Sequence, residues 1–331
     1  MKIFASYLSD YAQKNNISLA LISVVETIVG ACVKISNQVR LGDLSGILGE
    51  AGTGNIQGEQ QKKLDVLANQ ILVEQLSNNE KIAGIASEEE DNFICLNSEQ
   101  NYLVLFDPLD GSSNTDVNIS IGTIFSILKK SNEKLEEKHF LQAGKEQIAA
   151  GYVLYGPQSI LVLSFGREVL MFTLNDKQDF IPNTQVVSIP KQTQEFAINM
   201  SNQRYWEQPM QQYIHGLLQG KEGERQKNYN MRWVASMVAE VHRILRRGGI
   251  FLYPKDSRQT NQNGKLRLLY EANPMSFIVQ AAGGKASSLT SDILDIKPQK
   301  LHQRVPVVLG SSEEVDFAQQ LHIINSKRGN K

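Results

Sequence analysis

Six short apolar runs separated by turn residues occupy the middle of this chain, and they restrict its fold more than any other feature. The runs span residues 81–87, 102–107, 119–128, 149–156, 159–166 and 168–174. Their length and their content of valine, isoleucine and aromatic residues are typical of β-strands. After them, strand-like segments alternate with helical ones, as in WVASMVAEVHRILRRG followed by GIFLYP. Strands followed by helices that cover the sheet predict a layered α/β sandwich.

The length of the chain sets how many such units it can form. A chain of 331 residues suits one large domain or two of ordinary size, and its 41% of hydrophobic residues can fill a sizeable core. A stretch at residues 190–194 precedes the second group of alternating strands and helices. We therefore predict an N-terminal αβ domain over residues 1–189 and a C-terminal αβ domain over residues 190–331.

The N-terminal region combines a long helical pattern with a glycine-rich segment. Residues 5–40 have helical character, whereas residues 42–58 are rich in glycine, so we predict a mobile loop there. Residues 17–35 are apolar enough to suggest a membrane span. Glu26 in the middle of this stretch and Lys34 near its end favour a buried helix of a soluble protein instead.

Charge and cysteine content exclude several functions and indicate a compartment. The formal net charge of −1 gives no overall field that would attract nucleic acid or an anionic membrane, so we expect neither as a partner. An anionic substrate would therefore need a local basic cluster. Cys32 and Cys95 are too few for a disulfide framework, and we expect both to be reduced in a cytoplasmic protein.

Acidic side chains gather where loops leave regular elements. They are Glu59, Asp65, Glu88, Glu89, Asp107, Asp110 and Glu271. Oxygen ligands without an accompanying cysteine or histidine pattern suit Mg²⁺ or Mn²⁺ better than Zn²⁺. In the sequence DPLD, Pro108 fixes a turn that lets both aspartates and the carbonyl of Leu109 point to one side. An ordinary Asp-Pro turn with a capping aspartate is the alternative interpretation of this segment.

The residues after DPLD add a second kind of binding group. Gly111 permits close approach of the backbone, and the successive N–H groups of Gly111, Ser112 and Ser113 can cradle an anion where a helix or turn begins. Carboxylates that bind a metal beside a phosphate cradle are what the metal-assisted transfer of a phosphoryl group to water requires. The sequence therefore predicts the site of a metal-dependent phosphatase.

Several longer segments resemble the class I fructose-1,6-bisphosphatases, which belong to the lithium-sensitive, Mg²⁺-dependent sugar and inositol phosphatases. The matching segments are, in order, GEQQKKLD, ASEEE, FDPLDGSSN, ISIGTIFSIL, AAGYVLYG, GKLRLLYEANP and AGGKAS. The resemblance implies an α/β fold, the layered αβαβα sandwich of these phosphatases, with two αβ domains. It also implies hydrolysis of the 1-phosphate of fructose 1,6-bisphosphate to fructose 6-phosphate, in gluconeogenesis or the reductive pentose phosphate cycle.

The same resemblance assigns the metal-binding and catalytic roles to residues of this chain. The metal ligands would be Glu88, Asp107, Asp110 and Glu271, together with the backbone carbonyl of Leu109. They would hold two or three Mg²⁺ per subunit, with Mn²⁺ as the alternative ion. Catalytic roles around the attacking water would fall to Glu59, Asp65 and Glu89.

The resemblance also implies where a sugar bisphosphate would lie. The 1-phosphate would bind the amides of Gly111, Ser112 and Ser113 and lie near Arg267, while Lys265 would hold sugar hydroxyls. The 6-phosphate would bind Asn199, Arg232 and Tyr253. Arg232 would reach this pocket from a neighbouring subunit, as part of the homotetramer that is usual in the family.

Three positions depart from the family pattern. Asn202 and Trp233 replace tyrosines that are common in the remote phosphate pocket, and Asn202 lacks the reach of a tyrosine. In the animal enzymes a Lys-Tyr pair before the DPLD strand helps to hold AMP, whereas this chain has Asn101 and Tyr102 there. Because Asn101 carries no charge, we expect weak or absent inhibition by AMP through that site.

Three other functions remain compatible with these residues. A sedoheptulose-1,7-bisphosphatase, or an enzyme with both specificities, would differ only in the remote phosphate pocket. An inositol monophosphatase is less consistent, because a site for one phosphate does not need the basic second half of the chain. A non-catalytic regulator that binds sugar phosphates could share the fold, but every predicted metal position is still acidic.

Overall fold

The computed structural model describes residues 1–46, 48–54, 60–131, 133–258, 260 and 262–328. Its larger β-layer is an eight-stranded sheet. In spatial order its strands are β10 (Phe180–Pro182), β9 (Val169–Leu174), β8 (Ser159–Ser164), β7 (Ala149–Tyr155), β6 (Ile121–Lys129), β5 (Tyr102–Asp110), β3 (Ile82–Ser87) and β4 (Ile94–Cys95). All six apolar runs are strands of this sheet, so the strand predictions are confirmed.

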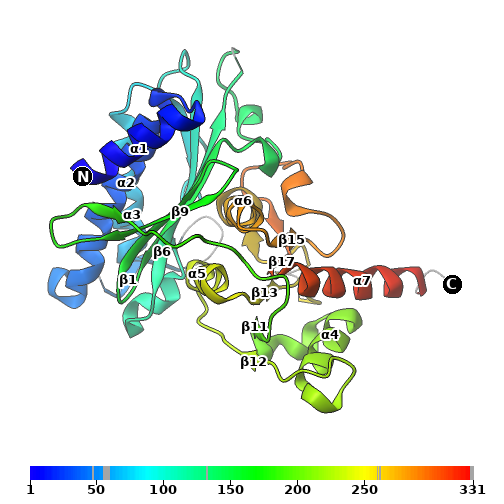
Figure 1. Ribbon diagram of the computed structural model, residues 1–331. Helices are drawn as coiled ribbons and strands as arrows, with labels where there is room; N and C mark the ends of the chain where they lie inside the picture. The colour runs from blue at the N-terminus through cyan, green and yellow to red at the C-terminus, as the bar shows by residue number, and fades with distance from the viewer. Residues whose placement is uncertain (47, 55–59, 132, 259, 261, 329–331) are drawn as a thin grey trace.

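Three helices cover one face of the eight-stranded sheet (Figure 1). They are α1 (Lys2–Asn15), α2 (Leu19–Leu41) and α3 (Lys63–Ser77). Buried side chains such as Phe4 and Ile28 share one core with Phe106 and Phe125 of the sheet. By length and composition α2 and the turn after it could cross a membrane, but 61% of the most apolar window is buried inside the protein. The apolar side chains of α2 are therefore part of the protein core.

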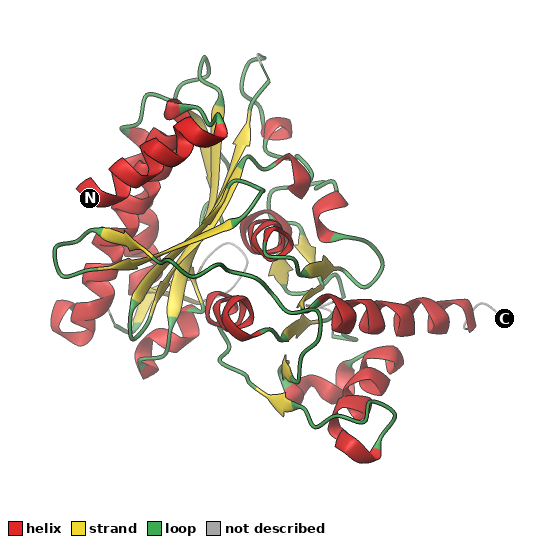
Figure 2. Cartoon of the chain, in the orientation of Figure 1, coloured by secondary structure: helices red, strands yellow, loops and turns green. Residues whose placement is uncertain are grey.

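The other face of this sheet packs on α5 (Met237–Arg247) and α6 (Asn273–Ala281) (Figure 2). Beyond these helices lies a five-stranded sheet. Its strands, in spatial order, are β12 (Asn230–Met231), β11 (Glu195–Ala197), β13 (Ile250–Tyr253), β17 (Val307–Gly310) and β15 (Lys285–Ser287). Its outer face packs on α4 (Gln208–Leu218) and α7 (Ser312–Arg328). The order of the layers is αβαβα, as predicted.

The glycine-rich segment contains more regular structure than a loop. A 3₁₀ turn spans Gly42–Ser45, and β1 (Glu50–Gly54) pairs antiparallel with β2 (Gln60–Lys62). The Asp116 carboxylate fastens the base of this hairpin, because it accepts the Gly49 amide at 3.1 Å and pairs with the Lys62 ammonium at 2.8 Å. The prediction of a loop throughout residues 42–58 is therefore wrong for the described part, since backbone pairing is available there. Residues 55–59 lie outside the described residues.

A second short sheet lies close to the carboxylates of the predicted site. In it β14 (Leu266–Arg267) pairs antiparallel with β16 (Arg304–Val305). A single π-helical turn, Leu268–Ala272, then connects β14 to α6. This turn carries Glu271, and π-helical turns of this kind are frequent at functional sites.

Candidate active site

The register of the eight-stranded sheet brings two acidic segments together. β3 and β5 are parallel, and Ser87 pairs with Phe106, so the residues that follow, Glu88 and Asp107, leave the sheet at the same edge. The Glu88 amide donates to the Phe106 carbonyl at 3.0 Å, which extends this pairing by one step. The segments SEEE and DPLD therefore become neighbours, although they lie far apart in the sequence.

A bulge in β5 places its two aspartates. Asp107 pairs with Ile124 and Asp110 with Gly122, so three steps along β5 match two steps along β6. The Pro108 carbonyl accepts the Thr123 hydroxyl at 2.9 Å, and the Leu109 amide donates to Asp107 Oδ1 at 2.9 Å. The bulge thus gives Asp107 and Asp110 positions that a regular strand could not provide.

Three carboxylates form a buried cluster at this bulge. Asp107, Asp110 and Glu271 each offer an oxygen atom, and these atoms lie within 4.8 Å of one another. We call these residues, with the adjacent Glu88, the carboxylate cluster. Asp110 Oδ2 accepts the Ser236 hydroxyl at 3.0 Å and the Val238 amide at 2.9 Å, so the first turn of α5 holds it in place. The structure therefore brings Asp107, Asp110 and Glu271 together, and the role of these acids as metal ligands stays a prediction.

Burial makes the ionised form of the carboxylate cluster costly. Burial and then Glu88 raise the pKa of Asp107 well above its usual value. Burial raises the pKa of Asp110 to about 6. Burial, and next repulsion from Asp110, raise the pKa of Glu271 to about 7. A divalent cation among these oxygens would offset both the desolvation and the repulsion, and an all-oxygen set of carboxylates suits a hard ion. The residues present therefore fit a divalent metal site.

Arg267 gives the cluster a buried positive charge. Its side chain is almost completely buried, and its Nε lies 3.3 Å from Glu88 Oε1. Its backbone amide donates to Glu271 Oε2. One residue therefore contacts two of the predicted metal ligands, which is consistent with a predicted place near the reacting phosphate.

Asp65 lies beside the cradle that follows DPLD. It is buried in the first turn of α3, where its Oδ2 accepts the Lys62 amide at 2.8 Å. Burial raises its pKa to about 7, and the nearby Glu89 adds to the rise, while a hydrogen bond with Ser112 opposes it. Asp65, Glu89 and Ser112 are thus brought together. Glu59 lies outside the described residues.

Gly111 has the backbone conformation that the predicted cradle needs. Its φ of +76° is in the left-handed region, and a Cβ placed there would lie 2.7 Å from the Cβ of Ser236. A 3₁₀ turn, Ser112–Val117, begins directly after it, with Ser112 partly buried and Ser113 exposed. This arrangement leaves the start of the turn next to the residue that holds Asp110.

Two of the three residues predicted for the remote phosphate, Asn199 and Tyr253, lie together beside the end of β13. Asn199 and Tyr253 line one small pocket together with Asn202 and Asp256. Trp233 stacks on Phe251 with 6.2 Å between ring centroids and also lies 6.2 Å from the Tyr253 ring. The ammonium of Lys265 lies 5.9 Å from the centroid of the Tyr253 ring. Asn199 Oδ1 already accepts the hydroxyl of Ser201 at 2.6 Å.

β14 links the two halves of the predicted site. Lys265 is exposed and contacts Tyr253 of the remote pocket, whereas the buried Arg267 contacts the carboxylate cluster. The guanidinium of Arg232 is half exposed and pairs with Glu195, with 3.5 Å between Nε and Oε1. A sugar with a phosphate at each end would thus find basic side chains around both ends.

Sequence reasoning missed the groups that hold these residues in place. Ser236 and the Val238 amide bind Asp110, and Asn69 connects Ser87 to Glu90 through hydrogen bonds of 2.7 and 2.8 Å. Ser236 stands directly before the apolar helical run, which is a helix-start signal that could have been recognised. The Asn69 contacts have no comparable local signal.

Comparisons with known proteins agree along nearly the whole chain. The family model "Fructose-1-6-bisphosphatase, N-terminal domain" matches residues 5–184, and "Fructose-1-6-bisphosphatase, C-terminal domain" matches residues 189–323. A "Fructose-1,6-bisphosphatase class 1" of Neisseria meningitidis is 58% identical over 322 residues, covering 97% of this chain and 99% of that protein. The protein of this name from Neisseria gonorrhoeae is 56% identical over 322 residues, with the same coverage.

A solved structure has a similar fold. It is the crystal structure of Leishmania major fructose-1,6-bisphosphatase in holo form, which is 35% identical in sequence to this chain. The two superimpose with a TM-score of 0.89, over 95% of this chain and 98% of that one.

Proposed function

The chain belongs to the fructose-1,6-bisphosphatase family and hydrolyses fructose 1,6-bisphosphate, and we propose that the 1-phosphate is removed at the carboxylate cluster. The observation that carries this assignment is the buried meeting of Asp107, Asp110 and Glu271 beside Arg267. Three buried acids so close together would destabilise a protein that has no positive ligand for them. The products are fructose 6-phosphate and inorganic phosphate.

Enzymes of this family depend on a divalent metal, and we assign Mg²⁺, with Mn²⁺ as the alternative, at two or three ions per subunit. Glu88, Asp107, Asp110 and Glu271 would hold them, with the backbone carbonyl of Leu109 as a further ligand. When bound, these cations would make a coordinated water more acidic and neutralise charge on the oxygen that leaves the phosphorus. The preference for Mg²⁺ rests on the all-oxygen ligand set.

Asp65 would accept the proton of the attacking water, with Glu89 beside it. A pKa of about 7 suits a general base near neutral pH, because such a group is ionised often enough to act and basic enough to take a proton. The hydrogen bonds to the Lys62 amide and to Ser112 fix the orientation of the carboxylate. Glu59 joins this group on the resemblance alone, since it lies outside the described residues.

The substrate would span the two halves of the site. The 1-phosphate would lie on the amides of Gly111, Ser112 and Ser113 and near Arg267, with Lys265 close to the sugar. The 6-phosphate would bind Asn199, Tyr253 and Arg232 of a neighbouring subunit, so the active assembly would be a homotetramer. The mostly buried apolar stretch of α2 and the two free cysteines support a cytoplasmic location. We propose that a boundary near residue 190 separates an N-terminal αβ domain from a C-terminal one.

Phosphate release from the purified protein tests this proposal. We expect fructose 1,6-bisphosphate to be hydrolysed in Mg²⁺ and hydrolysis to stop with a chelator. Asp110→Asn should reduce kcat by about 10³-fold, because a charged ligand is lost while the hydrogen bonds to α5 are retained. Asp295→Asn, which removes a carboxylate of an exposed ion pair with Lys145, is the matched control and should leave kcat unchanged.

Wild-type turnover in both Asp107→Asn and Asp110→Asn would place the reaction elsewhere. No observation favours the seven-carbon sugar bisphosphate as the main substrate, since the Neisseria relatives carry the name of the six-carbon enzyme. The clustered acids likewise give no support to a non-catalytic regulator.

A further inference from the structure

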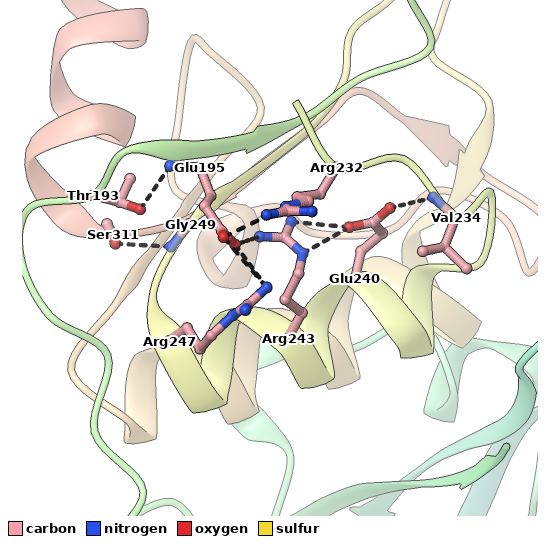
Figure 3. Close-up of polar contacts among 9 residues, drawn as sticks. All are labelled: Thr193, Glu195, Arg232, Val234, Glu240, Arg243, Arg247, Gly249 and Ser311. Atoms are coloured by element: carbon pink, nitrogen blue, oxygen red, sulfur yellow. Dashed lines mark hydrogen bonds and ion pairs between the residues drawn. The ribbon is translucent and has the colours of Figure 1, made fainter. Parts of the chain in front are cut away.

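An ionic network joins α5 to β11 and to the segment that carries Arg232 (Figure 3). Its centre is the guanidinium of Arg243, which lies 2.7 Å from Glu195 Oε2 and 2.9 Å from Glu240 Oε2. Glu240 is fully buried, and its other oxygen accepts the Val234 amide at 2.6 Å. We call Glu195, Glu240 and Arg243 the ion ladder. Nothing in the proposed reaction uses these three residues directly.

The ion ladder and its neighbours hold the Arg232 segment from several sides. The Arg232 amide donates to the Phe196 carbonyl at 2.8 Å, which continues the parallel pairing of β12 with β11. The Arg232 side chain pairs with Glu195, and two residues later Val234 is bound by Glu240. Between them Trp233 stacks on Phe251 (ring planes 3° apart). The backbone on both sides of the guanidinium is therefore fixed.

The charges around Glu195 leave Arg232 available to an anion. Glu195 faces three guanidinium groups, those of Arg232, Arg243 and Arg247. Its contact with Arg243 is short, at 2.7 Å, whereas its contact with Arg232 is 3.5 Å. Glu195 and Glu240 together carry two negative charges against these three cations, so one positive charge is left over, and the Arg232 side chain remains 51% exposed. A phosphate can therefore bind Arg232 without displacing the ladder.

The same helix also holds the carboxylate cluster. The first turn of α5 binds Asp110 through Ser236 and Val238, and the middle of α5 carries Glu240 and Arg243. A helix hydrogen-bonded along its length keeps these two sets of contacts at a fixed distance. α5 therefore couples the position of a metal ligand to that of the Arg232 segment.

We propose that the ion ladder positions Arg232 for recognition of the substrate's remote phosphate. This inference rests on the proposed binding of that phosphate by Arg232. Holding a long side chain and its backbone in place beforehand reduces the entropy lost on binding, so the ladder should act on substrate affinity. Glu195, Glu240 and Arg243 are positioning residues and would not touch the substrate.

Steady-state kinetics of Glu195→Gln tests this role. Gln keeps the shape but loses the charge that orients Arg232 and Arg243, so KM for fructose 1,6-bisphosphate should rise about tenfold while kcat stays within about twofold. Glu195→Asp, which keeps the charge on a shorter side chain, should recover part of the affinity and serves as a second, conservative variant. Arg247→Met removes an exposed arginine from the same carboxylate and should leave KM near that of the wild type.

A double-mutant cycle separates positioning from a general loss of structure. If Glu195 acts through Arg232, Glu195→Gln should raise KM no further in a chain that already carries Arg232→Ala. Multiplying KM by the same factor in both backgrounds, or lowering kcat at unchanged KM, would overturn the positioning role. A wild-type KM in Arg232→Ala itself would instead reject the proposed function of Arg232. Thermal unfolding of each variant identifies any that is simply unstable.

Discussion

At the scale of single residues, the proposed role of Asp65 as the base that accepts the proton of water can be tested directly. Its Oδ2 accepts the Lys62 amide, and an asparagine oxygen can accept that same hydrogen, so Asp65→Asn should keep the start of α3 intact. The variant loses the basic oxygen, and we expect kcat to fall by about 10²-fold or more with KM within about threefold of the wild type. Initial rates over a range of substrate concentrations measure both constants. A rise in KM at unchanged kcat would remove Asp65 from proton transfer.

Gly111 combines a left-handed backbone conformation with a close neighbour. Alanine at φ +76° would place its Cβ 2.7 Å from the Cβ of Ser236, and the shift that this forces would disturb the hydrogen bond from the Ser236 hydroxyl to Asp110. We expect Gly111→Ala to lose about 1–3 kcal/mol of unfolding free energy and most of its activity. Gly283→Ala is the matched control, because φ is +85° there with nothing within 4 Å of the new Cβ.

Denaturant unfolding and activity assays of both glycine variants separate the effect of backbone strain from that of the contact with Ser236. Gly283→Ala should lose stability through backbone strain alone and keep full activity. Equal activity in the two variants would show that Ser236 and Asp110 tolerate the extra methyl group. It would also weaken the case that the first turn of α5 must hold Asp110 where it is.

Single site residues could be predicted from the sequence where several functional residues are neighbours in the chain. DPLDG marked Asp107 and Asp110 as candidate ligands and Gly111 as a place of close backbone approach, because a proline, two acids and a glycine stand next to one another. Glu195 and Arg243 pair across 48 positions of the chain. The sequence around each of them contains no motif that distinguishes it from an ordinary charged residue at the protein surface. Contacts of that kind come only from the packed fold.

At the scale of elements, α5 has a buried histidine that should make its packing sensitive to pH. His242 Nδ1 lies 3.0 Å from the Tyr152 hydroxyl, and burial followed by Arg246 lowers its pKa from 6.5 to about 4. Above pH 6.5 the histidine is neutral in both states and favours neither. As the pH falls from 6.5 to 4, the unfolded chain takes up the proton first, so the folded state loses up to about 3 kcal/mol.

The difference in unfolding free energy between the wild type and His242→Asn isolates the contribution of this histidine. The buried acids are present in both proteins, and their raised pKa values change stability with pH in the opposite direction. His242→Asn keeps a side chain that can hydrogen-bond but removes the titration. The unfolding free energy of the wild type should fall relative to that of His242→Asn between pH 6.5 and 4. Denaturant melts at several pH values measure it. A constant difference across this range would show that His242 titrates normally in the folded protein.

Elements with long apolar runs were predictable from the sequence, whereas the short strands β1 and β2 were not. The six apolar runs became β3, β5, β6, β7, β8 and β9, because several consecutive apolar residues favour burial whatever the surrounding sequence. β1 pairs with β2 through a shifted register in a glycine-rich stretch, and glycine has no side chain that could indicate a strand. The hairpin depends instead on Asp116, which lies in a distant turn.

At the scale of the whole molecule, the proposed crossing of Arg232 into a neighbouring subunit makes each active site the product of two chains. An Arg232→Ala subunit keeps a complete carboxylate cluster but cannot supply the guanidinium to its neighbour. An Asp110→Asn subunit has lost a metal ligand, yet its Arg232 and ion ladder are intact. Each variant alone should therefore hydrolyse fructose 1,6-bisphosphate poorly when the substrate concentration is low.

Mixed assemblies of these two subunits should regain activity, because the defects then fall in different sites. A complete site needs the cluster of an Arg232→Ala subunit and the arginine of an Asp110→Asn neighbour, and random pairing supplies this in about a quarter of the sites. Co-refolding the two variants and assaying phosphate release at low substrate concentration measures the recovery. If Arg232 served its own subunit, no mixture would exceed the summed rates of its parents, because every site would keep one of the two defects.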